Sequence, residues 1–140
     1  MAYELSTVDV WAGSIEDRPG GLARVMETLA KAGVNLQFII ERRDTPGKGV
    51  VFCAPIEGAA QVKAAKAAGL AKSNSLRSLR VEGPDKGGLG ARVTRAIAGA
   101  GVNVRGVSGA ALGKRAVIYL AFDSRSDATK ASNALKNALK

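Results

Sequence analysis

Apolar residues recur at helical spacing in the first third of the chain, between stretches that alternate as strands do. Residues 7–12 alternate apolar and polar positions, which predicts a half-buried strand. After a break at 17–21, an apolar stripe predicts a helix ending at a left-handed Gly33; the stripe is Leu22, Val25, Met26, Leu29 and Ala30. Strands are predicted at 34–43 and 50–54, and an alanine-rich helix at 59–68.

The second half of the chain repeats this order. It predicts a strand at 78–82, a helix over about 90–100, a strand at 102–108, a turn at 109–113, a strand at 116–122 and a helix at 127–140. Residues 17–35 align with 85–103 at a constant offset of 68 residues, and ten of the 19 aligned positions are identical. The duplication predicts two modules, at residues 1–72 and 73–140.

Each module follows the order β-α-β-β-α, so the predicted fold class is α+β. We expect two ferredoxin-like modules in tandem, each an antiparallel sheet with helices packed on one face. The fourth strand usual in this fold is not evident. Residues 76–81 could close the first module, but the second needs them as its opening strand. An unpaired sheet edge promotes association, so we expect the modules to pair with each other or with a second chain.

Composition narrows the chemistry. The chain has no histidine, which removes the commonest general base and zinc ligand, so we expect no catalytic residue, metal site or cofactor. The one cysteine, Cys53, lies in an apolar strand, where a buried residue is favoured over a nucleophile. The sequence shows no signal peptide and no apolar run long enough for a membrane span. A cytoplasmic protein without membrane contact is therefore expected.

Charge is distributed unevenly along the chain. Residues 1–58 carry six Lys/Arg and eight Asp/Glu, whereas residues 59–140 carry fifteen and four. A basic half fits either an anionic partner such as nucleic acid or solvated helix faces. The second interpretation is favoured, because most lysines fall on predicted helices.

The repeated loop resembles the pattern of the ACT domain family. In the first copy, residues 17–22 (Asp-Arg-Pro-Gly-Gly-Leu) follow a strand and open a helix, and residues 33–35 (Gly-Val-Asn) start the next strand. The second copy matches less closely, because Gly87 replaces the proline and Leu89 stands one place earlier. The resemblance implies small regulatory β-α-β-β-α-β modules that bind amino acids or similar effectors between paired modules. Such modules are usually fused to an enzyme or a DNA-binding domain.

The glycine loops are the candidate ligand sites. Glycine lets a ligand approach the main chain, and the first turn of a helix offers unpaired N–H groups that suit a carboxylate. We expect the first loop's amides to hold an amino acid's α-carboxylate while Asp17 accepts from its α-ammonium group. The candidate residues are Asp17, Arg18, Pro19, Gly20, Gly21, Leu22 and Asn35 in the first loop, and Asp85, Gly87, Gly88, Leu89 and Asn103 in the second. In a purely structural alternative, Asp17 caps the helix and the two asparagines bond the main chain.

Three function classes follow. The first is a non-catalytic, allosteric amino-acid sensor that acts as a homodimer on an enzyme or a transcription factor. The alternative is a basic scaffold that binds nucleic acid or a partner protein, although its strands offer few aromatic residues for base stacking: Trp11, Phe38, Phe52, Tyr119 and Phe122. An enzyme comes third, because the acidic pair Glu16-Asp17 has no accompanying base or nucleophile and the loops lack P-loop chemistry.

Overall fold

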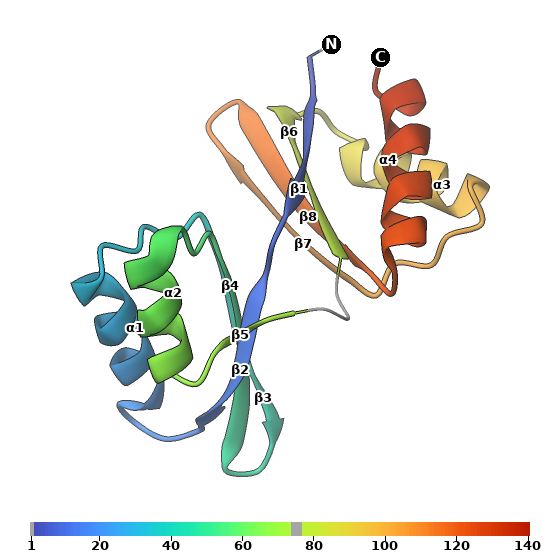
Figure 1. The fold of residues 1–140 in the computed structure, drawn as a ribbon. Coiled ribbons are helices and arrows are strands. Elements are labelled where there is room, and N and C mark those ends of the chain that lie inside the picture. The colour runs from blue at the N-terminus through green and yellow to red at the C-terminus, as the bar shows by residue number, and fades with distance from the viewer. Residues whose placement is uncertain (1, 74–76) are drawn as a thin grey trace. The chain divides into compact units, whose positions relative to one another are not determined.

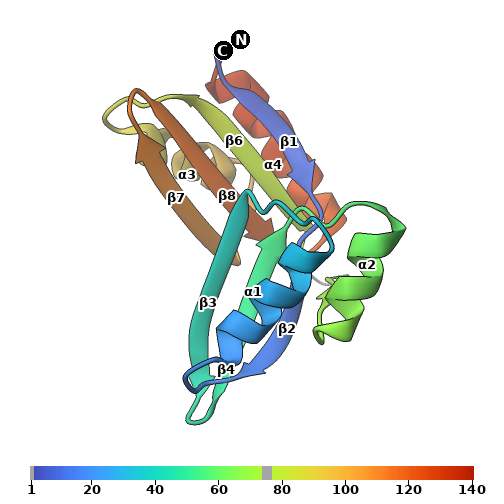
Figure 2. The same ribbon diagram turned by 90° about the vertical axis from the view of Figure 1, so that its left-hand side faces the viewer.

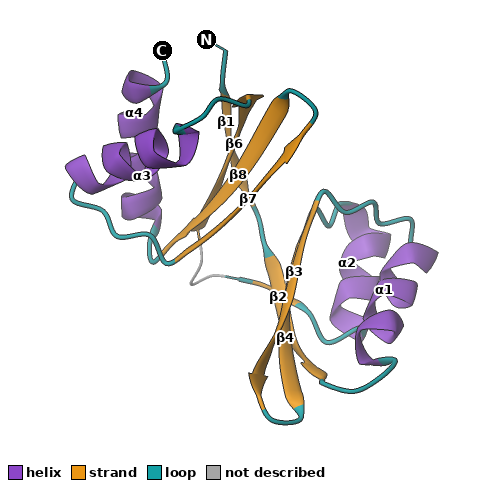
Figure 3. Cartoon of the chain, turned by 180° about the vertical axis from the view of Figure 1, so that it is seen from behind, coloured by secondary structure: helices purple, strands orange, loops and turns teal. Residues whose placement is uncertain are grey.

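The computed structural model describes residues 2–73 and 77–140. Within these ranges the chain forms four α-helices and eight β-strands, in two four-stranded antiparallel sheets (Figure 1). The helices of each unit cover one face of its sheet (Figure 3). The predicted α+β fold of two ferredoxin-like modules is confirmed.

Unit 2 spans residues 9–73 and contains the first glycine loop. Its sheet has the strand order β3-β4-β2-β5. The elements in chain order are β2 (Trp11–Glu16), α1 (Gly21–Lys31), β3 (Phe38–Thr45), β4 (Lys48–Ala54), α2 (Gly58–Ala67) and β5 (Ala71–Lys72).

Unit 1 joins the N-terminal residues up to Val8 to the chain from residue 77 onward. Its sheet has the strand order β1-β6-β8-β7, which repeats the topology of unit 2 with β1 in the place of β5. The elements are β1 (Glu4–Val8), β6 (Arg77–Pro84), α3 (Leu89–Gly99), β7 (Gly106–Leu112), β8 (Arg115–Phe122) and α4 (Arg125–Ala138).

The fourth strand of each sheet comes from within the chain, which corrects the predicted β-α-β-β-α order. In unit 1 it is β1, antiparallel to β6 from Glu4 opposite Glu82 to Val8 opposite Ser78 (Figure 2). In unit 2 it is the short β5, which pairs only with Trp11 and Ala12 of β2. The predicted closing segment begins at Leu76, outside the described residues, and its remainder belongs to β6.

The single strand predicted at 7–12 is wrong. Two strands, β1 and β2, are separated by Asp9 and Val10 and belong to different sheets. The alternating pattern runs through this junction, so it conceals the point where the chain leaves one unit for the other. Residues 1–8, expected in the first module, are therefore part of unit 1.

The predicted turn at 109–113 is also wrong, because β7 extends through Leu112 and only Gly113 reaches the left-handed region, with φ 62°. Glycine, serine and alanine occupy most of this edge strand, and such small residues are also common in turns. The left-handed glycine predicted at the end of the first helix is confirmed: Gly33 has a φ of 80°, and Gly101 has a φ of 74° at the equivalent position after α3.

Each unit has its own apolar core, to which the predicted helix stripes contribute. In unit 2, Val25 and Leu29 of α1 pack with Trp11 and Cys53. Cys53 is fully buried, and this burial raises its pKa from 9.0 to about 11, so the thiol is protonated at neutral pH and is a core residue rather than a nucleophile. The core of unit 1 includes Tyr3, Leu79, Val81, Leu89, Val93, Ile97, Leu120, Phe122 and Leu135.

Candidate functional site

The first glycine loop connects β2 to α1 through a tight main-chain approach. Gly20 immediately precedes the helix with φ 86°, a conformation that favours glycine. A Cβ at Gly21 would lie 2.1 Å from the carbonyl oxygen of Glu16, so only glycine fits there without moving the main chain. The Asp17 N–H donates to Gly47 O at 3.1 Å and anchors the loop to the β3–β4 turn.

One of the main-chain N–H groups that we expected to bind a ligand already donates a hydrogen bond within the loop. The Gly21 N–H donates to Arg18 O at 3.0 Å, so this amide is not free. No side chain caps α1, which corrects the alternative in which Asp17 is the helix cap. Within residues 2–73 and 77–140, the N–H groups of Leu22 and Ala23 donate no hydrogen bond. The positive end of the helix therefore keeps two unpaired donors.

A pocket of about 260 Å³ opens beside this loop. Its apolar floor includes the buried side chains of Ile15 and Val25. Its polar wall carries Glu16, Arg18 and Arg24, which are exposed. The complete lining is Ser14, Ile15, Glu16, Arg18, Pro19, Gly20, Gly21, Arg24, Val25 and Ala68.

The pocket exists because β5 is short. Pairing of β5 with β2 ends at Ala12, so the β2 residues that follow lack a strand partner on this side. The chain before β5 crosses close to Gly13, where a Cβ would lie 2.4 Å from Gly69 O. Ala68 follows α2 and lines the pocket with only a methyl group, which leaves the space open.

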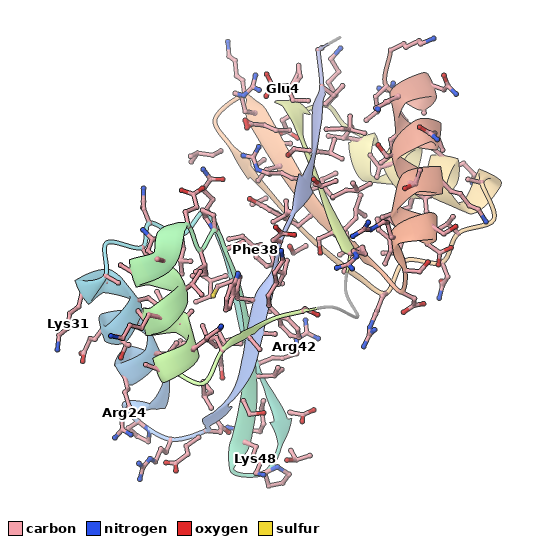
Figure 4. The ribbon with its side chains drawn as sticks, viewed as in Figure 1. Glu4, Arg24, Lys31, Phe38, Arg42 and Lys48 are labelled. Atoms are coloured by element: carbon pink, nitrogen blue, oxygen red, sulfur yellow. The ribbon has the colours of Figure 1, made fainter. Side chains whose placement is uncertain are left out.

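The charged groups of the pocket can serve both ends of a zwitterion. Arg18 Nε and Glu16 Oε2 form an ion pair, but both side chains are more than half exposed, and exposed pairs contribute at most about 1 kcal/mol. A ligand can therefore displace this pair at little cost. In the described part of the chain, no carboxylate lies within ion-pairing distance of Arg24, the fourth residue of α1 (Figure 4). Arg24 is thus available to a ligand anion.

Several residues predicted for the first site lie outside the pocket. The Asp17 carboxylate accepts a hydrogen bond from Arg43 Nε, and this contact holds the pKa of Arg43 above its usual value. Asn35 is exposed before β3 and does not line the pocket, and neither does Leu22. Arg18, Pro19, Gly20 and Gly21 do line it.

Six of the ten residues that line the pocket were not among the predicted site residues. Ser14, Ile15 and Glu16 belong to a strand that was predicted four residues too early. Val25 was predicted only as part of the apolar helix stripe, and Ala68 ends a helix that is distant in sequence. Arg24 could have been found from the sequence, since the same residue type stands at this position in both copies of the repeat. Glu16, rather than Asp17, is the carboxylate at the pocket.

The second loop has the same main-chain form. Gly88 precedes α3 with φ 87°, and the Asp85 N–H donates to Lys114 O at 2.8 Å. Gly87 and Gly88 are exposed, Leu89 is buried in the core of unit 1, and Asn103 is exposed before β7. The five residues predicted there are therefore split between surface and core.

No cluster of three or more His, Cys, Asp or Glu residues that could hold a metal ion occurs in the described part of the chain. Among the same residues, no helix is both long and apolar enough to span a membrane.

The fold and the loop define a duplicated ferredoxin-like module whose β-to-α loop borders a small polar pocket. Residues 14–68 match the family model of the ACT domain, so the predicted resemblance is confirmed for the unit that contains the pocket. No curated protein matches the sequence.

Solved structures share the fold over the whole chain. The ligand-free regulatory subunit of aspartate kinase from Thermus thermophilus has a TM-score of 0.69 at 18% identity, over 100% of this chain and 98% of that one. A protein from Bacteroides thetaiotaomicron has a TM-score of 0.77 at 18% identity, over 98% and 90%. The regulatory subunit from Thermus flavus has a TM-score of 0.64 at 19% identity, over 100% and 98%. At these identities the likeness establishes the fold.

Proposed function

We propose that the pocket of unit 2 binds a free amino acid and that the protein is a non-catalytic regulator. The observation that carries the proposal is a pocket that combines Arg24, the Glu16 carboxylate and an apolar floor, next to the start of α1, where the N–H groups of Leu22 and Ala23 are unpaired. The α-carboxylate would bind at the helix N-terminus and Arg24, and the α-ammonium group would bind Glu16. The volume of the pocket, about 260 Å³, is below the roughly 300–1,000 Å³ of pockets for drug-sized ligands, and this smaller size suits an amino acid.

Thermal denaturation with each proteinogenic amino acid tests this function. At a hundred times its dissociation constant, a ligand stabilises the folded protein by about 2.7 kcal/mol. We expect Arg24→Gln to weaken binding of the amino acid that raises the melting temperature by roughly ten-fold, or about 1.4 kcal/mol, because one charge-assisted contact is lost. Lys31→Gln, at the far end of α1 (Figure 4), is the matched control and should bind as the wild type does. If no amino acid raises the melting temperature, the proposal fails.

The regulated partner is proposed to be an enzyme in the cytoplasm. Two of the structurally similar proteins are regulatory subunits of a kinase, which supports an enzyme over a transcription factor. Affinity purification of the tagged chain, with and without the responding amino acid, tests this partner. Recovery of a DNA-binding protein instead would contradict it.

We infer further that the protein is a homodimer. The edge strand β7 has no charged residue over Gly106–Leu112, and Val107 and Leu112 are 59% and 88% exposed. Uncharged, apolar edge strands pair with other strands unless they are protected. We expect Val107→Lys to convert the dimer to a monomer in sedimentation experiments. Ala91→Lys, on an exposed position of α3, should leave the dimer intact, and a monomeric wild type would contradict the inference.

The nucleic-acid alternative loses support from the burial of three of its five aromatic residues, whereas Phe38 and Phe52 are half-buried. Trp11 and Phe122 are 6% and 0% exposed, and Tyr119 is 8% exposed, so these rings are not available for base stacking.

A further inference from the structure

The two glycine loops present the same donors in the same arrangement. The Gly21 N–H donates to Arg18 O at 3.0 Å, and at the equivalent position the Leu89 N–H donates to Lys86 O at 3.1 Å. Each helix begins directly after a left-handed glycine. The loop geometry alone therefore gives no reason for one unit to have a ligand site and the other to lack it.

The units differ in what lies against the strand that precedes the loop. In unit 1 the Tyr3 side chain lies on β6: a Cβ at Gly83 would be 2.3 Å from Tyr3 Cδ1, and the Tyr3 hydroxyl donates to Pro84 O at 2.8 Å. Tyr3 is only 4% exposed. By the offset of 68 residues, Gly83 corresponds to Ile15, which lines the pocket of unit 2. Tyr3 thus covers the part of unit 1 that borders the pocket in unit 2.

The fourth strands explain this difference. In unit 1, β1 pairs along β6 as far as Glu4 opposite Glu82, which brings Tyr3 to the next position of the strand. In unit 2, β5 pairs only with Trp11 and Ala12, and Ala68 lines the space beyond it. A large aromatic side chain beside Gly83 in unit 1 therefore lies where unit 2 has the smaller side chains of Ile15 and Ala68.

A second side chain contributes to the filling. Leu89, 6% exposed, belongs to the same core cluster as Tyr3 and stands where unit 2 has Gly21. Exposure along the two strands agrees with this difference. Ser14 and Glu16 are exposed in unit 2, whereas their counterparts Glu82 and Pro84 are half-buried.

We propose that Tyr3 occupies the glycine-loop site of unit 1 as a tethered internal ligand, so that the chain has one open site and one that its own N-terminal segment closes. The proposal rests on the proposed function of unit 2 for the nature of the ligand. It assigns to Tyr3 a role besides core packing, because removal of the ring uncovers a second site of the same kind. The protein then responds to its effector through unit 2 alone.

Calorimetric titration of the full chain tests the proposal. The probe is whichever proteinogenic amino acid, assayed singly, raises the melting temperature of the wild type. We expect one molecule bound per wild-type chain and two per Tyr3→Ala chain. Tyr3→Phe, which keeps the ring and removes only the hydroxyl contact with Pro84, should still bind one. If Tyr3→Ala proves unfolded, Tyr3→Leu retains more core volume and is judged by the same stoichiometry.

The outcomes separate the two proposals. Two molecules bound per wild-type chain, or one per folded Tyr3 variant that lacks the ring, would overturn the role of Tyr3 and leave the site of unit 2 standing. No binding to the wild type would overturn the proposed function of unit 2.

Discussion

Deletion of residues 2–8 is expected to unfold unit 1 and to leave unit 2 folded. The deletion removes the whole of β1 and with it the buried Tyr3 side chain and the half-buried Leu5. Truncation of one buried aromatic side chain to alanine costs about 3–5 kcal/mol, and a small domain has about 5–15 kcal/mol in total. β6 would also lose its partner along five residues. Losses of this size remove most of the stability of unit 1.

The unfolding of the two units can be followed by different spectroscopic signals. Its one tryptophan, Trp11, is buried in the core of unit 2, so its fluorescence reports the unfolding of that unit alone. We expect the unfolding transition followed by Trp11 fluorescence to be retained, while the circular dichroism signal of the chain loses the part that unit 1 contributes. Ser6→Thr, at an exposed position of β1, is the control and should change stability by less than about 0.5 kcal/mol. An unchanged circular dichroism spectrum after the deletion would contradict the assignment of β1 to unit 1.

Gly21→Ala is expected to abolish ligand binding and to destabilise unit 2 by about 1–3 kcal/mol, the usual cost of overpacking. The added Cβ would lie 2.1 Å from Glu16 O and 3.2 Å from Glu16 C. Both neighbours belong to the main chain, so the loop has to move, and the pocket with it. Trp11 fluorescence in denaturant measures the stability, and the thermal response to the amino acid measures the binding.

Gly90→Ala is the matched control in unit 1. Gly90 is an exposed α3 residue, and a methyl group added there would meet nothing within 4 Å, so alanine should stabilise that unit by about 0.5–1 kcal/mol. A Gly21→Ala protein that keeps both its stability and its ligand response would show that close approach at Gly21 does not shape the site.

The repeat and the helix periodicity were sufficient to predict the fold class. The stripe positions Val25, Leu29, Val93 and Ile97 are all buried, and both loops begin their helices after a left-handed glycine. These features are local: they depend on residues within one turn of helix or one loop, and the sequence records them directly.

The partner of β6 could not be predicted from such patterns. β1 is separated from β6 by the whole of unit 2, and the two strands meet only through long-range pairing. Asp9 and Val10 link β1 to β2, and neither is a glycine or proline that would indicate a change of sheet. The strand was therefore placed in the wrong sheet.

The candidate site was predicted in part, for a related reason. The loop residues Arg18, Pro19, Gly20 and Gly21 were found, since the motif contains them. The pocket beside them depends on where β5 stops and on the size of Ala68, which are properties of the sheet edge rather than of the loop.

The most direct test of the account is a titration of the isotope-labelled wild-type protein, followed through its amide resonances. We predict that one amino acid shifts the resonances of Leu22, Ala23 and Arg24 in α1 together with that of Glu16, while the loop at Gly87 and Gly88 is unaffected. Shifts confined to residues outside both the pocket and the start of α1, or no shift with any amino acid, would contradict the claim that the first glycine loop is a ligand site.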